Sequence, residues 1–310
     1  MNAIKSHANA TESAAEQKWP GKEVLALAMQ FQLAGEGLVM RWPGGGRLVG
    51  LQNSGLEIAD FRAYSQGDDF RFIDQYALAR LDQLVVRLFH DRRSLPLTIF
   101  LDTSASMNFG QPNKFRIARD LTLVFGLAAL RHRDRLTVVR NAGFVSDAIE
   151  IRKFDRPQSA AGFIAWLRQT RANALQPSET SIRRILATIP PRGMLLVISD
   201  FLPPAGMAEM VSLSAALQRR MAVLQVLSPE ELYPTAAPAA ELIDSESGLS
   251  RRIATGAAAA AHYRKNIAGW MAQLQGAARQ YGVPWIVCAT NEPIRKIFLN
   301  RALMTATSRG

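Results

Sequence analysis

Short apolar runs alternate with longer amphipathic stretches between residues 95 and 290. The apolar runs are rich in Val, Ile and Leu, and they predict strands at 96–102, 135–141, 146–152, 194–200, 221–227 and 283–289. Apolar residues at helical spacing predict helices at 113–132, 157–170, 179–189, 206–220 and 260–281. This alternation predicts an α/β fold, with a doubly wound, mostly parallel sheet covered by helices on both faces.

One pair of predicted strands departs from the parallel pattern. Only a few residues, within "NAGFVSD", separate the runs at 135–141 and 146–152. A parallel crossover needs about a dozen residues or more, so this pair must form an antiparallel hairpin. The sheet is therefore expected to carry one antiparallel edge strand.

Three segments are expected along the chain. Residues 1–18 hold few large apolar side chains and are expected to be disordered. Residues 19–94 combine a helix at 21–38 with a segment of alternating charge. Residues 95–310 form the α/β domain, with an insertion near 228–258 that we interpret as a loop with a short hairpin.

Composition limits the location and the chemistry of the protein. The only cysteine, Cys288, lies in the apolar run "PWIVCAT", so a disulfide within the chain is excluded. The N-terminus lacks the apolar segment of a signal peptide, and no apolar run is long enough to cross a bilayer. We therefore expect a cytoplasmic protein, with peripheral membrane association only through partners.

The chain is basic, with 37 Lys and Arg against 26 Asp and Glu, giving a net charge of +11. That charge would suit nucleic acid, an anionic membrane or an acidic protein partner. The basic residues are spread over short clusters such as "RHRDR" and "LQRRM", with no long basic tail. This dispersion makes nucleic acid a weak alternative.

Small oxygen-bearing side chains follow the first strand of the predicted sheet. Asp102 ends the run "LTIFLD", and Ser104 and Ser106 follow at alternate positions. Ligands of open parallel sheets bind beyond the carboxyl ends of the strands, where these side chains can converge. Hard oxygen donors of this kind suit Mg²⁺ or Mn²⁺, so the stretch predicts a metal site.

Further oxygens are expected from two other strand ends. Asp200 ends the run "LLVISD". Thr180 or Ser181 lies at the start of a predicted helix, where either hydroxyl could instead cap the helix N-terminus. Capping is likewise the alternative for Asp200, because aspartates at strand ends often cap the next helix.

The pattern Asp102-x-Ser104-x-Ser106 resembles the metal-ion-dependent adhesion site of von Willebrand factor A domains. The resemblance implies a doubly wound sheet with one antiparallel edge strand. It also implies that a threonine and an aspartate from two other loops complete the site, and Thr180 and Asp200 match those roles. In that family the metal ion can bridge to a carboxylate of a partner protein.

The upstream segment "FRAYSQGDDFRFID" resembles the bacterial family called domain of unknown function 58, whose members are typically encoded beside MoxR-type AAA+ ATPases. Gln75 stands where that family usually has tryptophan. Six residues on the motif are candidates for a partner-binding surface or for a structural clasp built on bidentate arginine–carboxylate pairs: Arg62, Tyr64, Asp68, Arg71, Asp74 and Arg80.

The resemblance implies a non-enzymatic adaptor that binds a MoxR-type ATPase or its client proteins through a metal ion, in protein or metallocofactor assembly. A Mg²⁺-dependent phosphohydrolase is an alternative. Such enzymes need a second aspartate two residues after the first as general acid, and Ser104 occupies that position. Nucleic-acid binding is the other alternative, and it predicts affinity that falls steeply with salt.

Overall fold

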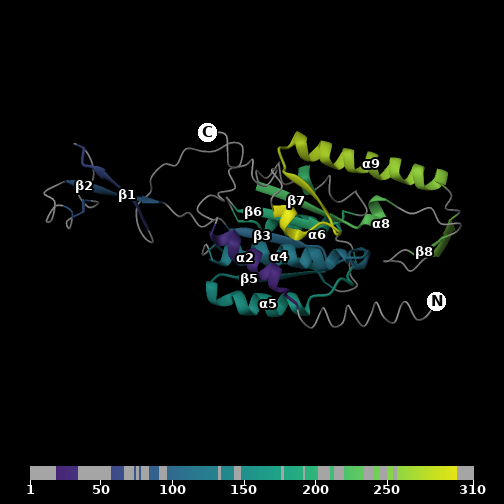
Figure 1. The fold of residues 1–310 in the computed structure, drawn as a ribbon, viewed down its shortest axis with the longest axis horizontal. Helices are drawn as coiled ribbons and strands as arrows, with labels where there is room; N and C mark the ends of the chain where they lie inside the picture. The colour runs from purple at the N-terminus through teal and green to yellow at the C-terminus, as the bar shows by residue number, and fades with distance from the viewer. Residues whose placement is uncertain are drawn as a thin grey trace. The chain divides into compact units, whose positions relative to one another are not determined.

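The computed structural model describes residues 19–33, 57–65, 73–74, 77, 84–90, 96–131, 134–142, 148–175, 178–190, 193–201, 210–212, 220–233, 240–243, 250–253 and 257–298. Its main feature is a six-stranded sheet (Figure 1). In spatial order the strands are β10 (Trp285–Ala289), β7 (Arg220–Leu227), β6 (Met194–Ser199), β3 (Leu97–Leu101), β4 (Leu136–Asn141) and β5 (Ile149–Phe154).

All neighbouring strands of this sheet are parallel except β4 and β5, which pair antiparallel at one edge. The predicted fold class and the edge hairpin are therefore confirmed, and this is the arrangement that the resemblance to von Willebrand factor A domains implies. The prediction placed the start of the edge strand at residue 146, whereas β5 begins at Ile149.

Helices cover both faces of the sheet. One face carries α2 (Lys22–Leu33), α4 (Lys114–Arg131) and α5 (Ala160–Gln169), and the other carries α6 (Glu179–Ala187) and α9 (Ala257–Gln280). Shorter helical turns are η2 (Ala105–Asn108), η3 (Pro157–Ser159), α8 (Pro229–Leu232) and α10 (Ile294–Phe298). Of the predicted helix at 206–220, the structure describes 210–212, which are helical, and Arg220, which begins β7.

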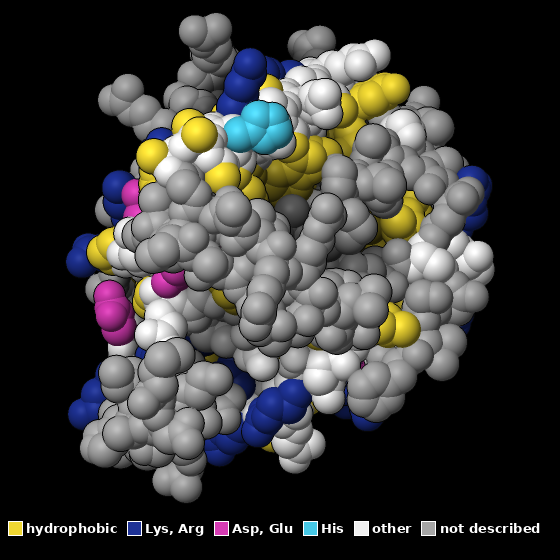
Figure 2. All heavy atoms as spheres, turned by 90° about the vertical axis from the view of Figure 1, so that its right-hand side faces the viewer, with side chains coloured by type: hydrophobic (Ala, Val, Ile, Leu, Met, Phe, Trp, Pro, Cys, Tyr) yellow, Lys and Arg dark blue, Asp and Glu magenta, His cyan; other side chains and the backbone are white. Residues whose placement is uncertain are grey.

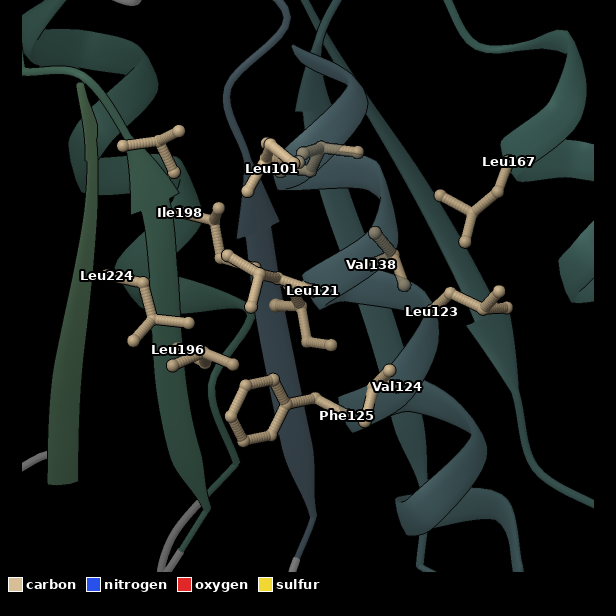
Figure 3. Close-up of a cluster of buried hydrophobic side chains, with 14 of the residues drawn as sticks. Leu101, Leu121, Leu123, Val124, Phe125, Val138, Leu167, Leu196, Ile198 and Leu224 are labelled. Atoms are coloured by element: carbon tan, nitrogen blue, oxygen red, sulfur yellow. The ribbon is translucent and has the colours of Figure 1, made fainter. Parts of the chain in front are cut away.

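The central strands β3 and β6 are buried on both sides because they are apolar at successive positions. Ile99 and Leu101 point to the α4 face, whereas Phe100 between them joins the core beneath α6 and α9. Figure 3 shows the first core, where side chains of α4 such as Leu121 and Phe125 interlock with the strands. This double burial holds the strand ends, and hence the residues that follow them, in fixed positions.

Gly126 allows α4 to pack closely against α5. A Cβ atom at this position would lie 2.4 Å from the ring of Phe163 and 3.1 Å from the side chain of Leu136. We expect Gly126→Ala to lower the free energy of unfolding by about 1–3 kcal/mol, the usual cost of overpacking. Gly269→Ala in α9 is the matched control, since nothing lies within 4 Å of the added Cβ. Urea denaturation of both variants measures the difference, and an equal response would contradict the packing argument.

Trp19 anchors the chain beside α2 to α4. Its Nε1 donates a 2.6 Å hydrogen bond to Oδ1 of Asp120, and Arg119 lies over its ring at 4.4 Å. Helix α2 itself packs against α4, and it belongs to the compact unit that contains the sheet. From the sequence, this helix was expected to form one segment with the charged motif, in residues 19–94.

Asp120 makes stability depend on pH. Burial raises the pKa of its carboxyl from 3.8 to about 6, against the hydrogen bond from Trp19 and the charges of nearby arginines. Between these values the folded state binds more protons than the unfolded state, so the free energy of unfolding falls as pH rises from about 4 to about 7. We expect Asp120→Asn to remove about 2 kcal/mol of this fall between pH 4.5 and pH 7. Denaturant titrations at pH 4.5 and pH 7 measure it, and an unchanged slope with pH would contradict it.

Residues 44–94 form a second compact unit. Within it β1 (Glu57–Ala63) pairs antiparallel with β2 (Val85–His90), and Ile73 forms an isolated bridge to Val86. The sequence analysis predicted no strands here, because the alternating charges suggested ion pairing in an irregular segment.

The predicted insertion contains the expected short hairpin, formed by β8 (Ala240–Ile243) and β9 (Ser250–Ile253). The expected disorder of residues 1–18 lies outside the described residues. None of the helices in the described part of the chain is both long enough and apolar enough to span a membrane.

Candidate metal centre at the carboxyl end of the sheet

Asp102 lies immediately after β3 and is almost completely buried. Its backbone N–H donates to the carbonyl of Ile198, which continues the pairing with β6. Its Oδ1 accepts from the backbone N–H of Ser104 at 2.9 Å, and its Oδ2 accepts from Oγ of Ser199 at 2.5 Å. The carboxylate is therefore held in one orientation at the carboxyl edge of the sheet.

The two serines of the motif converge as the sequence predicted. The Oγ atoms of Ser104 and Ser106 lie 3.1 Å apart. Ser104 also forms a bridge to Ala174, and the N–H of Ala105 donates to the carbonyl of Ala174. The loop of residues 102–106 therefore runs beside the chain that follows α5, and backbone contacts to Ala174 hold it there.

Asn141 is a member of this group that the sequence analysis missed. It ends β4, and its Nδ2 donates to Oδ1 of Asp102 at 3.3 Å and to the carbonyl of Leu175 at 2.9 Å. Its Oδ1 is buried and has no hydrogen-bond partner within the described residues. Its place at the end of a predicted strand is the signal that could have identified it.

Asp200 follows β6 and is fully buried. Its backbone carbonyl accepts from Nε2 of Gln225 at 3.3 Å, and the next residue, Phe201, has a φ of 60°. A positive φ is costly for a residue with a side chain and persists only where the surroundings impose it. The turn is held by the N–H of Phe201, which donates to Oγ of Ser199. Asp200 is thus presented by a fixed and strained turn.

The carboxylates of Asp102 and Asp200 are both buried and close enough for their charges to interact. Burial, and next to it the charge of Asp200, raise the pKa of Asp102 from 3.8 to about 6, against the hydrogen bonds from Ser199 and Ser104. Such a shift means that the ionised form lacks a compensating positive charge of its own. A cation at this position would supply that charge.

Two further charged residues, Lys114 and Glu231, lie beside Asp200, although both are far from it in the sequence. Lys114 is fully buried at the first turn of α4, and its Nζ lies 2.7 Å from Oδ2 of Asp200 and 2.5 Å from Oε1 of Glu231. The sequence analysis identified neither residue. A lysine at the start of a helix usually faces solvent, and "SPEEL" is typical of a helix cap.

Thr180 differs from the other predicted ligands. It lies in the first turn of α6 with an exposed side chain, whereas Asp102, Ser104 and Asp200 are buried. Neither Thr180 nor Ser181 caps this helix, which was the alternative to a role in metal binding. Ser178 is the N-cap, and its side chain accepts from the backbone N–H of Ser181 at 3.2 Å. The role of Thr180 as a metal ligand stays a prediction.

The donor set fits a hard divalent cation. A buried carboxylate beside a second one, two facing hydroxyls and an amide oxygen without a partner are all oxygen donors of the kind that Mg²⁺ and Mn²⁺ bind. No group of three or more His, Cys, Asp or Glu residues suited to a metal occurs in the part of the chain that the structure describes. A metal here would therefore depend on the serine hydroxyls as well as on the aspartates.

The charged motif is only partly described. Arg62 lies in β1 opposite Val86, and the N–H of Tyr64 donates to the carbonyl of Leu84. Asp74 is buried, and its Oδ1 accepts from the N–H of Ala77 at 3.1 Å, as in a turn cap. This contact is structural. The remaining candidates, Asp68, Arg71 and Arg80, lie outside the described residues.

The basic charge is not concentrated on the face drawn in Figure 2. Among the residues described there, Lys and Arg side chains lie at separate places along the rim. On this face, the described basic side chains are as dispersed as the basic clusters of the sequence.

Comparison with known proteins gives a family and several relatives. Residues 60–273 match the family described as "Protein of unknown function DUF58". The chain is 24% identical over 241 residues to uncharacterized proteins of Mycobacterium tuberculosis and Mycobacterium bovis, and the alignment covers 76% of this chain and 75% of theirs.

Three solved structures are similar in fold. BatB from Bacteroides thetaiotaomicron is 14% identical with a TM-score of 0.41, covering 68% of this chain and 98% of that one. An aerotolerance-related membrane protein from Bacteroides fragilis is 15% identical with a TM-score of 0.40, covering 68% and 99%. A von Willebrand factor type A protein from Catenulispora acidiphila is 15% identical with a TM-score of 0.40, covering 69% and 42%.

Proposed function

The chain belongs to the family of proteins of unknown function DUF58, and we propose that it is a non-enzymatic adaptor that binds a protein partner through a divalent metal ion. The observation that carries the proposal is the convergence of Asp102, Ser104 and Ser106 beside Asp200 at the carboxyl edge of the sheet. Mg²⁺ or Mn²⁺ is the proposed ion.

In this proposal Asp102, Ser104 and Ser106 hold the ion, Asp200 contributes from the turn after β6, and Thr180 completes the set. When bound, the ion supplies a positive charge that can accept a carboxylate oxygen from another protein. The protein's own task is to keep the donors fixed, which the hydrogen bonds of Ser199 and Asn141 to Asp102 support. The partner then contributes an Asp or Glu side chain.

A non-enzymatic role is part of the proposal. Ser104 lies two residues after Asp102, at the position where a phosphohydrolase of similar fold needs an acid. A serine hydroxyl cannot act as a general acid at neutral pH. The buried oxygens around Asp102 are instead engaged in hydrogen bonds that fix the loop.

The proposed partner is a MoxR-type AAA+ ATPase or its client proteins, acting with this adaptor in the cytoplasm in protein or metallocofactor assembly. The resemblance of the segment from Arg62 to Arg80 to its family supports this choice, because members of that family are typically encoded beside such ATPases. The charged motif is a second candidate surface for the same partner.

A binding experiment with purified proteins tests this proposal. The full chain is immobilised, and a purified MoxR-type ATPase from the same genome is applied in Mg²⁺, in EDTA, and in EDTA followed by excess Mg²⁺. We expect capture that EDTA abolishes and Mg²⁺ restores, and no capture by Asp102→Ala. Capture that is insensitive to EDTA would overturn the metal bridge and favour the charged motif, and no capture would overturn the choice of partner.

A further inference from the structure

The buried lysine beside the metal centre has no role in the function proposed so far. Lys114 is the first residue of α4, and its side chain is fully buried together with that of Asp200. A buried ammonium group is costly, and the positive end of the helix dipole at this position adds to the cost. The two carboxylates of Asp200 and Glu231, both in direct contact with its Nζ, provide the compensation.

The ammonium group of Lys114 binds the carboxylate of Asp200, which is also one of the proposed ligands of the metal ion. Asp200 accepts from Lys114 through Oδ2, and the residue directly before it, Ser199, donates to Oδ2 of Asp102. A divalent cation bound at Asp102, Ser104 and Ser106 would be repelled by the ammonium group and would draw on the charge of Asp200. Two cations therefore compete for one buried carboxylate.

Glu231, the second partner of Lys114, lies in the short helix α8 that follows β7. It is the third residue of α8, and it forms a capping box with Ser228, each side chain accepting from the other's backbone N–H. Ser228 also packs against Gly110, four residues after Ser106, since a Cβ on Gly110 would lie 2.4 Å from the Cβ of Ser228. The position of α8 therefore depends on Lys114 and on the turn at Gly110 that follows η2.

We infer that Lys114 is an internal competitor of the metal ion, and that α8 responds to metal occupancy through Glu231. Without metal, the lysine is shared between Asp200 and Glu231. When a divalent cation draws on Asp200, the lysine shifts its bond to Glu231, and α8 is held more firmly. Because such coupling is reciprocal, a partner that contacts α8 changes the affinity of the metal site. This inference rests on the proposed metal site and adds its regulation.

Calorimetric titration with Mg²⁺ and Mn²⁺ alone tests the competition. Lys114→Met removes the ammonium group and keeps a side chain of similar length, and we expect it to bind the cation about tenfold or more tightly than wild type. Glu231→Gln removes one of the two negative charges that face Lys114, so the lysine stays on Asp200. We expect this variant to bind the cation more weakly than wild type. The matched controls are Lys296→Met and Glu292→Gln, which alter an exposed pair at 2.7 Å and are expected to change nothing.

Hydrogen exchange of the peptide that covers residues 228–233 tests the response of α8. We expect exchange at least about twofold slower in wild type when Mg²⁺ is added. The change should vanish in Glu231→Gln, which leaves the lysine bound to Asp200. If Lys114→Met fails to fold, the affinity and exchange of Glu231→Gln decide the matter alone.

The outcomes separate this inference from the proposed function. Wild-type binding with equal or weaker binding by Lys114→Met overturns the competition and leaves the metal site standing. If Lys114→Met binds the cation and the wild type does not, the result supports the inference that Lys114 excludes the ion. If neither protein binds a cation, both the inference and the metal-dependent function are overturned. If Lys114→Met binds the cation more tightly but Mg²⁺ leaves the hydrogen exchange of α8 in wild type unchanged, the coupling between the metal site and α8 is overturned.

Discussion

Replacing Asp102 with alanine is expected to abolish measurable binding of Mg²⁺ and Mn²⁺, with a loss of more than about 100-fold in affinity. The carboxylate is fixed by the loop of the two serines, and the other carboxylate near it, Asp200, is already paired with Lys114. The fold should persist, because the sheet and both cores remain and a buried carboxylate with a raised pKa is removed. Calorimetric titration and thermal unfolding measure the two effects.

Asp102→Asn is the matched control for this variant. Asparagine keeps the shape of the side chain and an oxygen that accepts from the N–H of Ser104, but it carries no charge. We expect it to lose metal binding like Asp102→Ala and to be the more stable of the two, because fewer buried donors lose their partner. If either variant loses cooperative unfolding, Asp102 serves the fold rather than a metal.

Replacing Lys114 with alanine is expected to lower the free energy of unfolding by about 3–5 kcal/mol, the usual cost of breaking a buried ion pair from one side. Asp200 and Glu231 would remain buried without the ammonium group that compensates their charges. Urea denaturation in EDTA measures this loss. Saturating Mg²⁺ should restore part of it, because a bound cation supplies positive charge near Asp200.

A double-mutant cycle identifies the interaction that is lost. Lys114→Ala, Glu231→Gln and the double variant are compared with wild type, and the loss in the double variant should be smaller than the sum of the single losses. Lys296→Ala, in an exposed pair with Glu292, is the control and should cost less than about 1 kcal/mol. Additive losses in the cycle would contradict an ion pair between Lys114 and Glu231.

The sheet could be predicted because each strand carries its own signal. The runs that became β3 and β6 are apolar at successive positions apart from Thr98 and Ser199, and a sheet buried on both faces accommodates such runs. The hairpin of β4 and β5 follows from the shortness of the connection. The strand β1, "EIADFRA", was missed because its charges outweighed its apolar positions.

The candidate site was predictable only where its residues are close in sequence or end a strand. Asp102, Ser104 and Ser106 form one local motif, and Asp200 ends an apolar run. The capping residue Ser178 was misjudged because several hydroxyls stand side by side in "PSETS", and local pattern alone does not choose among them. The exposed position of Thr180 depends on where α6 begins.

The sequence by itself determined the layered α/β fold, the antiparallel edge and the loop of Asp102, because hydrophobic period, connection length and strand-end position are local properties. Only the tertiary structure decided that Lys114 is buried and that it contacts Asp200, 86 residues away, and Glu231, 117 residues away. A lysine's burial depends on whether the fold brings compensating charges to it. No local sequence pattern predicts which charges will surround Lys114, because the ends of β3, β6 and β7 come together only when the parallel sheet has formed.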